Sequence, residues 1–293
     1  MKAEFFKMHG AGNDYVFFDC IKTDVLGYIS DNSKRPENIE KFVSHISKRR
    51  FSIGGDGAVF ICPSNVADVK MRMFNADGSE GKMCGNAIRC IGRYVYENLF
   101  KKTDITVETL SGVKKLKIIS NDKSGCLVSV DMGKADFSLD KIPMKTKDPS
   151  DKDFVLKNLL TGVKEYTSTA LSVGNPHVVI FTDDTDKINI EIEGKAIENH
   201  PFFPERVNVE FAKIIDTHTV KMRVWERGSG ETLSCGTGAC ATVAAGVKNG
   251  FLKYNEPIKV ILKGGELSVT CTDGFCLNLT GNAEKTYGGV YEI

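Results

Sequence analysis

The sequence predicts a mixed α+β (α/β) fold of two pseudo-symmetric domains, each a curled, mostly antiparallel sheet around a central helix. Two observations lead to this prediction. A Cys-Gly pair opens a helical pattern twice, and the surrounding motifs recur at one common offset. The runs between strand-like segments are mostly short, which favours antiparallel pairing. The expected N-terminal domain is 1–128 with 282–293, and the expected C-terminal domain is 129–281.

The internal repeat has an offset of 151 residues. At this offset the strand-like run Met71–Phe74 falls on Met222–Trp225, Glu80 falls on Glu231, and Cys84-Gly85 falls on Cys235-Gly236. Chance is a poor explanation for a strand, a helix start and a helix end that match at a single offset. The repeat therefore predicts that the two halves share one topology.

The composition is that of an ordinary soluble protein. The chain has 293 residues, of which 41% are hydrophobic and 26% charged, with a net charge of +1. So small a charge argues against nucleic acid and against a membrane surface as partners, since no basic excess exists to neutralise phosphates. No leader-like start and no apolar run of membrane-spanning length are seen, so we expect a cytoplasmic protein.

Cysteine is the residue type that first suggests chemistry. The count of nine is odd and no Cys-x-x-Cys pair occurs, which argues against a disulfide framework and a zinc site. Most of these thiols are expected to be small buried hydrophobes. Cys84 and Cys235 differ because each precedes a helix. There the unpaired N–H groups and the helix dipole should ease thiol ionisation and can also hold a carboxylate.

Two flanking regions carry further candidate residues. His9–Asp14 reads as a glycine-shaped turn containing Asn13. Gly54–Gly57 precedes a strand rather than a helix, so it does not have the order of a phosphate-binding loop. For the cluster Ile53-Gly54-Gly55-Asp56-Gly57 the sequence predicts either a shaped turn or a turn whose backbone something approaches closely.

If equivalent loops of the two halves meet across a cleft, two thiols would flank one small ligand. A redox pair would suit that arrangement. So would a two-base proton transfer, in which one thiolate removes a proton from a carbon and the other thiol donates to the opposite face. Glu226 offers a counter-charge for an ammonium group, and polar recognition could come from four more side chains, Arg227, Asn75, Asn175 and Asn208. Taken singly, these residues could equally be ion-paired surface groups or turn formers, and His177 could be a packed strand residue.

The chain resembles diaminopimelate epimerase over nearly its whole length. The matching motifs are Lys7-Met8-His9-Gly10-x-Gly12-Asn13-Asp14, Asn75-x-Asp77-Gly78-Ser79-x-x-x-x-Cys84-Gly85-Asn86-Ala87-x-Arg89, Gly174-Asn175-Pro176-His177, Pro204-Glu205-Arg206-Val207-Asn208, and Glu226-Arg227-Gly228-x-Gly230-Glu231-Thr232-x-x-Cys235-Gly236-Thr237-Gly238. The second and last of these motifs are long and specific.

The resemblance implies a diaminopimelate epimerase-like fold and a cofactor-independent, metal-free isomerase. Its reaction would be epimerisation of LL-2,6-diaminopimelate to the meso form, in lysine and peptidoglycan-precursor biosynthesis, with Cys84 and Cys235 as the acid/base pair. The backbone amides of Gly85, Asn86, Gly236 and Thr237 would hold the reacting carboxylate. The other implied substrate-binding residues are Asn13, Asn75, Asn175, Asn208, Glu226 and Arg227. His177 and Gly57 would be supporting residues, although some relatives carry a ligand-contacting Gln where Gly57 stands.

Three alternatives stay open at this point. A racemase of another amino acid could use the same scaffold and both thiols. A cysteine hydrolase could pair Cys84 with His177, but it would leave Cys235 unexplained. A non-catalytic amino-acid-binding module would need neither thiol. The expected partner is a small molecule. The oligomeric state is not determined by the sequence, and a homodimer is one of the open possibilities.

Overall fold

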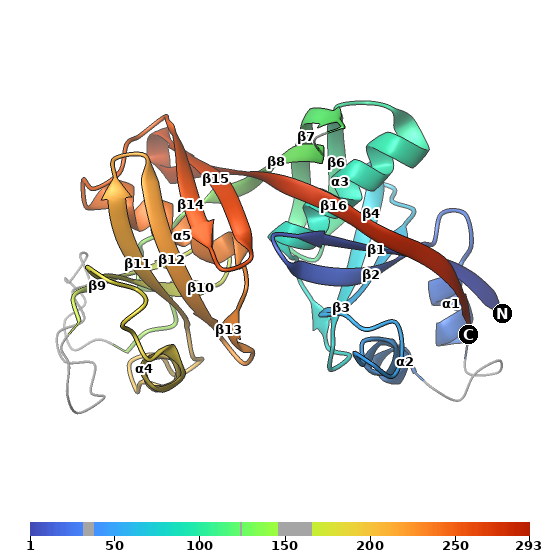
Figure 1. The fold of residues 1–293 in the computed structure, drawn as a ribbon, viewed down its shortest axis with the longest axis horizontal. Helices are drawn as coiled ribbons and strands as arrows, with labels where there is room; N and C mark the ends of the chain where they lie inside the picture. Colours follow the sequence, from blue (N-terminus) through green and yellow to red (C-terminus); the bar gives the residue numbers. More distant parts are fainter. Residues whose placement is uncertain (32–37, 124, 146–165) are drawn as a thin grey trace. The chain divides into compact units, whose positions relative to one another are not determined.

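Strands are the most frequent regular element in the computed structural model, which describes residues 1–31, 38–123, 125–145 and 166–293. The chain divides into two units. Unit 1 consists of Met1–Val130 with Gly281–Ile293, and unit 2 is Asp131–Thr280. Figure 1 shows that each unit contains a curved sheet with one helix among its strands. This confirms the predicted fold class.

Unit 1 has strands in the order β1-β2-β3-β4-β6-β7-β8. Their bounds are β1 (Lys2–Gly10), β2 (Asn13–Asp19), β3 (Gly57–Cys62), β4 (Val69–Asn75), β6 (Asp104–Thr109), β7 (Gly112–Asp122) and β8 (Gly125–Lys134), with the short β5 (Glu80–Gly81) beside β4. The pairs β2–β3 and β4–β6 are parallel, whereas β1–β2, β3–β4, β6–β7 and β7–β8 are antiparallel. Antiparallel pairing therefore dominates, as predicted.

Unit 2 repeats this order as β9-β10-β11-β12-β14-β15-β16. The bounds are β9 (Ser168–Ser172), β10 (Pro176–Phe181), β11 (Asn208–Asp216), β12 (Thr219–Glu226), β14 (Pro257–Leu262), β15 (Gly265–Thr272) and β16 (Cys276–Glu292), with the short β13 (Gly230–Thr232) beside β12. The parallel pairs are β10–β11 and β12–β14, at the positions equivalent to those of unit 1. The two units therefore share one topology.

The two central helices are α3 (Gly85–Val95) and α5 (Gly236–Lys248). Helix α3 contacts β1, β2, β6 and β7, and a π-helical turn (Tyr96–Phe100) follows it. Helix α5 contacts β9, β10, β11, β12 and β15 and is buried along nearly its full length. Its alanines and glycines leave it no polar face, which is the pattern of an enclosed helix.

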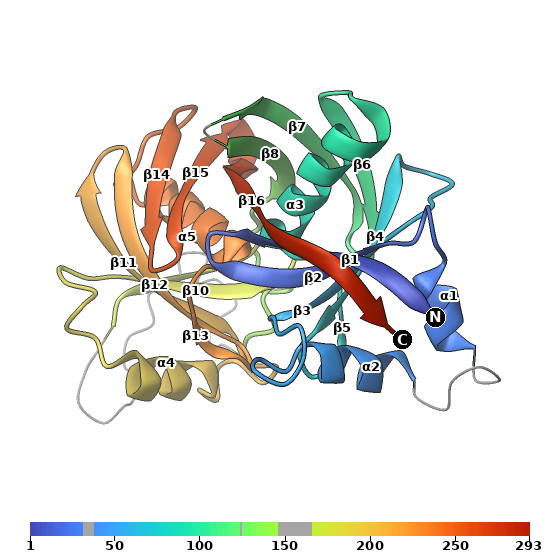
Figure 2. The same ribbon diagram turned by 45° about the vertical axis from the view of Figure 1, so that its right-hand side comes forward.

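Among the described residues, three peripheral helices flank the sheets. Unit 1 carries α1 (Val25–Ser30) and α2 (Ile39–Ile46), and unit 2 carries α4 (Ile190–Glu198). Figure 2 shows α2 and α4 at the ends of their units rather than among the strands. Helix α2 packs Phe42, Val43 and Ile46 into an aromatic-rich core with Phe18 and Phe60. Helix α4 begins at Asn189, whose side chain caps the first turn.

Strand β16 contributes to both units. Its first part pairs with β15 in unit 2, from Thr272↔Cys276 to Ser268↔Thr280. Its last part pairs with β1 in unit 1, ending at Lys2↔Glu292. The C-terminal segment is therefore built into the N-terminal unit by backbone hydrogen bonds. In the part of the chain that the structure describes, none of the helices has the length and apolarity needed to span a membrane.

Candidate active site

Cys84 is the N-cap residue of α3 in unit 1. Strand β4 ends at Asn75, and a turn with the short β5 leads to Cys84, whose backbone is extended (φ −131°, ψ 121°). The helix starts when the Ile88 N–H donates to the Cys84 carbonyl at 3.0 Å. N–H groups in the first turn of a helix have no partner within the helix, so this position suits an anion beside the thiol.

Asn13 connects the thiol of Cys84 to a charged network. The Cys84 Sγ donates to Asn13 Oδ1 at 3.4 Å, and Asn86 Nδ2 donates to the same oxygen at 3.4 Å. Asn13 Nδ2 in turn donates to Asp56 Oδ2 at 2.9 Å. Asp56 also binds Arg49 Nη2 at 2.9 Å. Because Asp56 can only accept, it fixes the amide of Asn13 with its oxygen toward Cys84.

Arg89 holds the first turn of α3 from within the core. Its side chain is fully buried, and it donates to Gly85 O and to Asn86 Oδ1, both at 2.9 Å. Gly10 makes room for it, since a Cβ at this glycine would lie 2.7 Å from Arg89 Nη2. The buried guanidinium thus stabilises the backbone on which Cys84 and Asn86 stand.

Asn75 and Gly57 lie opposite each other in the β3–β4 register. Asn75 is exposed and donates from Nδ2 to Ser79 Oγ at 3.1 Å. A Cβ at Gly57 would lie 2.0 Å from the Phe74 carbonyl oxygen. A neighbouring strand therefore approaches Gly57 closely, and no larger side chain fits there without a backbone shift.

Cys235 is the N-cap residue of α5 in unit 2, at the position equivalent to Cys84. Its sulfur accepts from the Gly238 N–H at 3.3 Å and lies 3.4 Å from Thr237 Oγ1. Burial and the charges of Glu226 and Glu210 raise the pKa of Cys235 well above the ordinary thiol value, against the effect of Thr237 and Gly238. The expectation that this helix start eases thiol ionisation is wrong in this environment, because desolvation and two carboxylates outweigh the helix start.

Glu226, at the end of β12, is the carboxylate beside this thiol. Burial raises the pKa of Glu226, while hydrogen bonds from Thr232 and from the Cys235 thiol act in the opposite direction. Thr232 Oγ1 donates to Glu226 Oε1. A carboxyl group and a thiol that both resist losing a proton can share one proton between them.

His177 and Asn175 form a second set of contacts at the start of α5. His177 is fully buried, with Nδ1 2.7 Å from Glu210 Oε1 and Nε2 2.9 Å from Asn175 Oδ1. Asn175 Nδ2 donates to Thr237 Oγ1 at 3.4 Å. These hydrogen bonds connect His177 to the first turn of α5.

Asn208 and Arg227 are joined through the backbone. Asn208 is buried, donates to Pro176 O at 2.9 Å and accepts from the Arg227 N–H at 2.9 Å. The exposed Arg227 side chain donates to Glu205 O at 3.0 Å. Asn208 thus connects β10 to the loop after β12 that carries Arg227.

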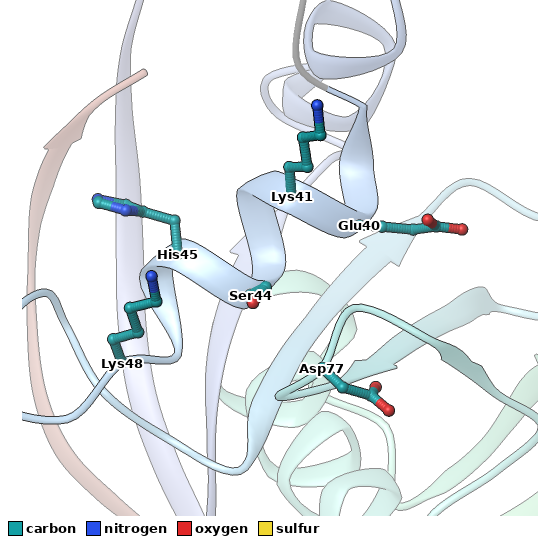
Figure 3. Close-up of a pocket in the computed structure, with 6 residues that line it drawn as sticks. All are labelled: Glu40, Lys41, Ser44, His45, Lys48 and Asp77. Atoms are coloured by element: carbon teal, nitrogen blue, oxygen red, sulfur yellow. The ribbon is translucent and has the colours of Figure 1, made fainter.

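A surface pocket in unit 1 lies apart from these residues. Figure 3 shows its lining: Glu40, Lys41, Ser44, His45 and Lys48 from α2 and the turn after it, with Asp77 opposite. None of the predicted site residues lines it. Among the described residues, no group of three or more His, Cys, Asp or Glu side chains is arranged to hold a metal ion.

Hydrogen bonds therefore join part of the predicted residues into two groups, one within each unit. In unit 1 they connect Cys84 to Asn13 and Asn86, next to Gly85. In unit 2 they connect Cys235, Thr237, Asn175, His177 and Glu226, next to Gly236. The sequence analysis missed the roles of Asp56, Arg89 and Glu210. Asp56 and Arg89 stood within motifs already singled out, whereas Glu210 lay unmarked in a strand.

The fold is shared with solved structures that include an amino-acid epimerase. A hydroxyproline epimerase from Agrobacterium vitis, solved with bound trans-4-hydroxy-L-proline, superposes with a TM-score of 0.68 at 14% identity. The alignment covers 99% of this chain and 91% of that one. At this identity the likeness concerns the fold alone.

Sequence comparison gives the particular family. The model of diaminopimelate epimerase matches residues 5–138 and 169–286. A diaminopimelate epimerase of Bacillus cytotoxicus is 42% identical over 289 residues, which are 98% of this chain and 96% of the relative. One from Methanococcus maripaludis is 43% identical over 293 residues, covering 99% and 100%. The chain belongs to the diaminopimelate epimerase family, which confirms the resemblance drawn from the motifs.

Proposed function

We propose that the protein interconverts LL- and meso-2,6-diaminopimelate by a two-base proton transfer between Cys84 and Cys235. The observation that carries the proposal is the repeated helix start. Each unit places one thiol at the N-cap of its central helix, in a chain that belongs to this family throughout. A reaction that inverts a carbon needs one acid/base group on each face, and two equivalent thiols meet that need.

The surroundings of each thiol support roles in proton transfer. Cys84 lies within hydrogen-bond distance of an amide oxygen, a contact to which its protonated thiol can donate. Cys235 lies beside Glu226, which can share its proton. When the substrate carbon loses its proton, the negative charge that develops toward the carboxylate would be stabilised by N–H groups at the two helix starts. We propose Gly85, Asn86, Gly236 and Thr237 as the residues that supply them.

The distal end of the substrate requires separate recognition. We propose Asn13, Asn75, Asn175, Asn208, Glu226 and Arg227 as the residues that bind the amino groups and the second carboxylate, with His177 in a supporting role. Arg227 offers a planar guanidinium for the carboxylate, and Glu226 offers a negative group for an ammonium. Gly57 has no side chain and can contribute only backbone atoms. The Phe74 carbonyl leaves no space for a larger residue at this position.

The proposal extends to the organisation of the protein. We propose that the domains are 1–128 with 282–293 and 129–281, and that one thiol from each acts on one carbon of the substrate. We also propose that the protein acts in the cytoplasm, where the precursors of lysine and peptidoglycan are made.

The test is an incubation in deuterated water with LL-diaminopimelate and a panel of other amino acids, without added cofactor. We expect deuterium at one α-carbon of diaminopimelate and none in the panel. Cys84→Ala and Cys235→Ala should each abolish inversion, while Cys276→Ala, which removes an exposed thiol, serves as the control. Full activity in either of the first two variants would contradict the two-base assignment. Label in another amino acid instead would favour the alternative racemase.

A further inference from the structure

A continuous chain of hydrogen bonds within unit 2 ends at the catalytic thiol. It runs from Glu210 on β11 to His177 on β10 (2.7 Å), then to Asn175 (2.9 Å), to Thr237 (3.4 Å) and to Cys235 (3.4 Å). Glu210 and His177 are both 0% exposed. A fully buried carboxylate is expensive unless it is paired, so this pair needs a physical explanation.

Both ring nitrogens of His177 face acceptors. Nδ1 faces a carboxylate oxygen, and Nε2 faces the side-chain oxygen of Asn175, whose amide nitrogen is used toward Thr237. A neutral imidazole carries one N–H and could satisfy only one of these acceptors. With Glu210 as a carboxylate, two N–H groups are needed, and the geometry then requires His177 to be an imidazolium ion paired with Glu210.

The surroundings of Glu210 strengthen this assignment. Its second oxygen, Oε2, is buried and has no hydrogen-bond partner in the described part of the chain. The positive charge that compensates the Glu210 carboxylate must therefore come from His177, through its contact with Oε1. Helix α5 leaves room for the carboxylate because residue 238 is a glycine; a Cβ there would lie 2.8 Å from Glu210 Oε1.

The imidazolium also determines which group donates and which accepts in each hydrogen bond between His177 and Cys235. With His177 donating to Asn175, the Asn175 amide donates to the Thr237 oxygen, and the Thr237 hydroxyl proton is directed toward the Cys235 sulfur. The Gly238 N–H donates to the same sulfur at 3.3 Å. With a neutral His177 accepting at Nε2, the amide would have to turn over, and Thr237 would accept from the thiol instead.

We infer that Glu210 is a positioning residue that holds His177 as an imidazolium and so directs the donors of Asn175 and Thr237 toward Cys235. The inference rests on the proposed function for its consequence in catalysis, but not for the charge state of His177. The other titratable group near this end of the chain is Glu226, which approaches Cys235 from β12.

The test is a nitrogen NMR spectrum of the protein labelled with ¹⁵N-histidine, recorded at pH 7.5. The sequence has five histidines, and the signal missing from His177→Gln identifies His177. We expect the pattern of an imidazolium in the wild type and in Glu210→Asp, and a neutral pattern in Glu210→Gln. The matched control is Glu256→Gln, which removes the carboxylate beside the exposed His218 and should leave the signal of His177 unchanged.

Activity provides the second readout. We expect Glu210→Gln to lower kcat by on the order of tenfold, with partial recovery in Glu210→Asp and no change in Glu256→Gln. A neutral His177 in the wild type would overturn the inference, and this result does not depend on any variant folding. An imidazolium that persists in a folded Glu210→Gln protein would overturn it as well. Unchanged kcat in Glu210→Gln would overturn the positioning role. An imidazolium in a wild-type protein that does not epimerise diaminopimelate would uphold the charge assignment while the proposed function fails.

Discussion

Cys84 and Cys235 occupy equivalent helix starts but have different polar partners. The Cys84 thiol donates to an amide oxygen that Asp56 holds in place. The sulfur of Cys235 accepts from the Gly238 N–H and lies among carboxylates. The repeat in sequence therefore reproduces the backbone position of the thiol without reproducing its electrostatic surroundings. We expect the two thiols to differ in reactivity for that reason.

The pH dependence of Cys235 alkylation tests these surroundings. Burial, Glu226 and Glu210 raise the pKa of Cys235, so its thiolate forms only at a pH above the ordinary thiol range. The rate of iodoacetamide labelling at Cys235, measured by peptide mass spectrometry, should keep rising beyond that range. Glu226→Gln removes a negative charge, which lowers the pKa of Cys235 and moves the rise to lower pH.

The control for this prediction is Glu256→Gln, which removes an exposed carboxylate elsewhere in unit 2. It should leave the labelling curve of Cys235 in place. A curve that does not move in Glu226→Gln, or that moves to higher pH, would show that Glu226 is not the charge that suppresses the thiolate.

At the residue scale, the sequence predicted the identities of the candidate residues better than their surroundings. Cys84 and Cys235 stood out because glycine and a helical pattern follow each of them. Glu210 could not be recognised, because an isolated carboxylate in a strand pattern reads as a solvent-facing residue. Its burial depends on His177, which is 33 positions away in sequence and adjacent only through the parallel β10–β11 register.

At the scale of elements, small residues allow close packing around the helices. Gly194 lies in α4 against Trp225 of β12, and a Cβ there would be 2.7 Å from the Trp225 Cβ. The indole cannot retreat freely, since its Nε1 donates to Glu198 Oε2 at 2.7 Å. Helix propensity alone would favour alanine at this position by about 1 kcal/mol.

Gly194→Ala tests whether packing outweighs propensity. Overpacking of a closed contact costs about 1–3 kcal/mol, so we expect a net loss in the free energy of unfolding despite the better helix former. Urea denaturation measures the change. Ile192→Ala is the matched control, because Ile192 lies in the same helix and is 63% exposed; its effect should stay within about 0.5 kcal/mol. A more stable Gly194→Ala protein would contradict the packing argument.

The elements themselves were predictable where a pattern was local. The Cys-Gly helices and most strands of the β-rich units had clear signals in periodicity and turns. The short helices α1 and α4 had weaker ones, since a helix of 6 or 9 residues shows at most two turns of a pattern. The length of β16 was not predictable from local patterns, because its exposed second half pairs with β1, a partner at the other end of the chain.

At the scale of the whole molecule, the repeat extends beyond the thiols. Arg72 pairs with Glu80 at 2.7 Å in unit 1, and Arg223 pairs with Glu231 at 2.8 Å in unit 2. Both ion pairs connect a long strand, β4 or β12, to the short strand that follows it before the helix start, β5 or β13. The two units thus share a construction that places one thiol in each, and the proposed inversion of one carbon by two bases would use both thiols.

The most direct test of this account is the isotopic course of the reaction in deuterated water. Under two-base transfer, the acceptor thiolate removes protium from LL-diaminopimelate and the other thiol delivers deuterium from the opposite face. At early times the meso product should carry deuterium at the inverted carbon, while the remaining LL substrate stays unlabelled. Meso product formed with its protium retained would mean that one base returns the proton it removed, and would contradict the two-thiol mechanism.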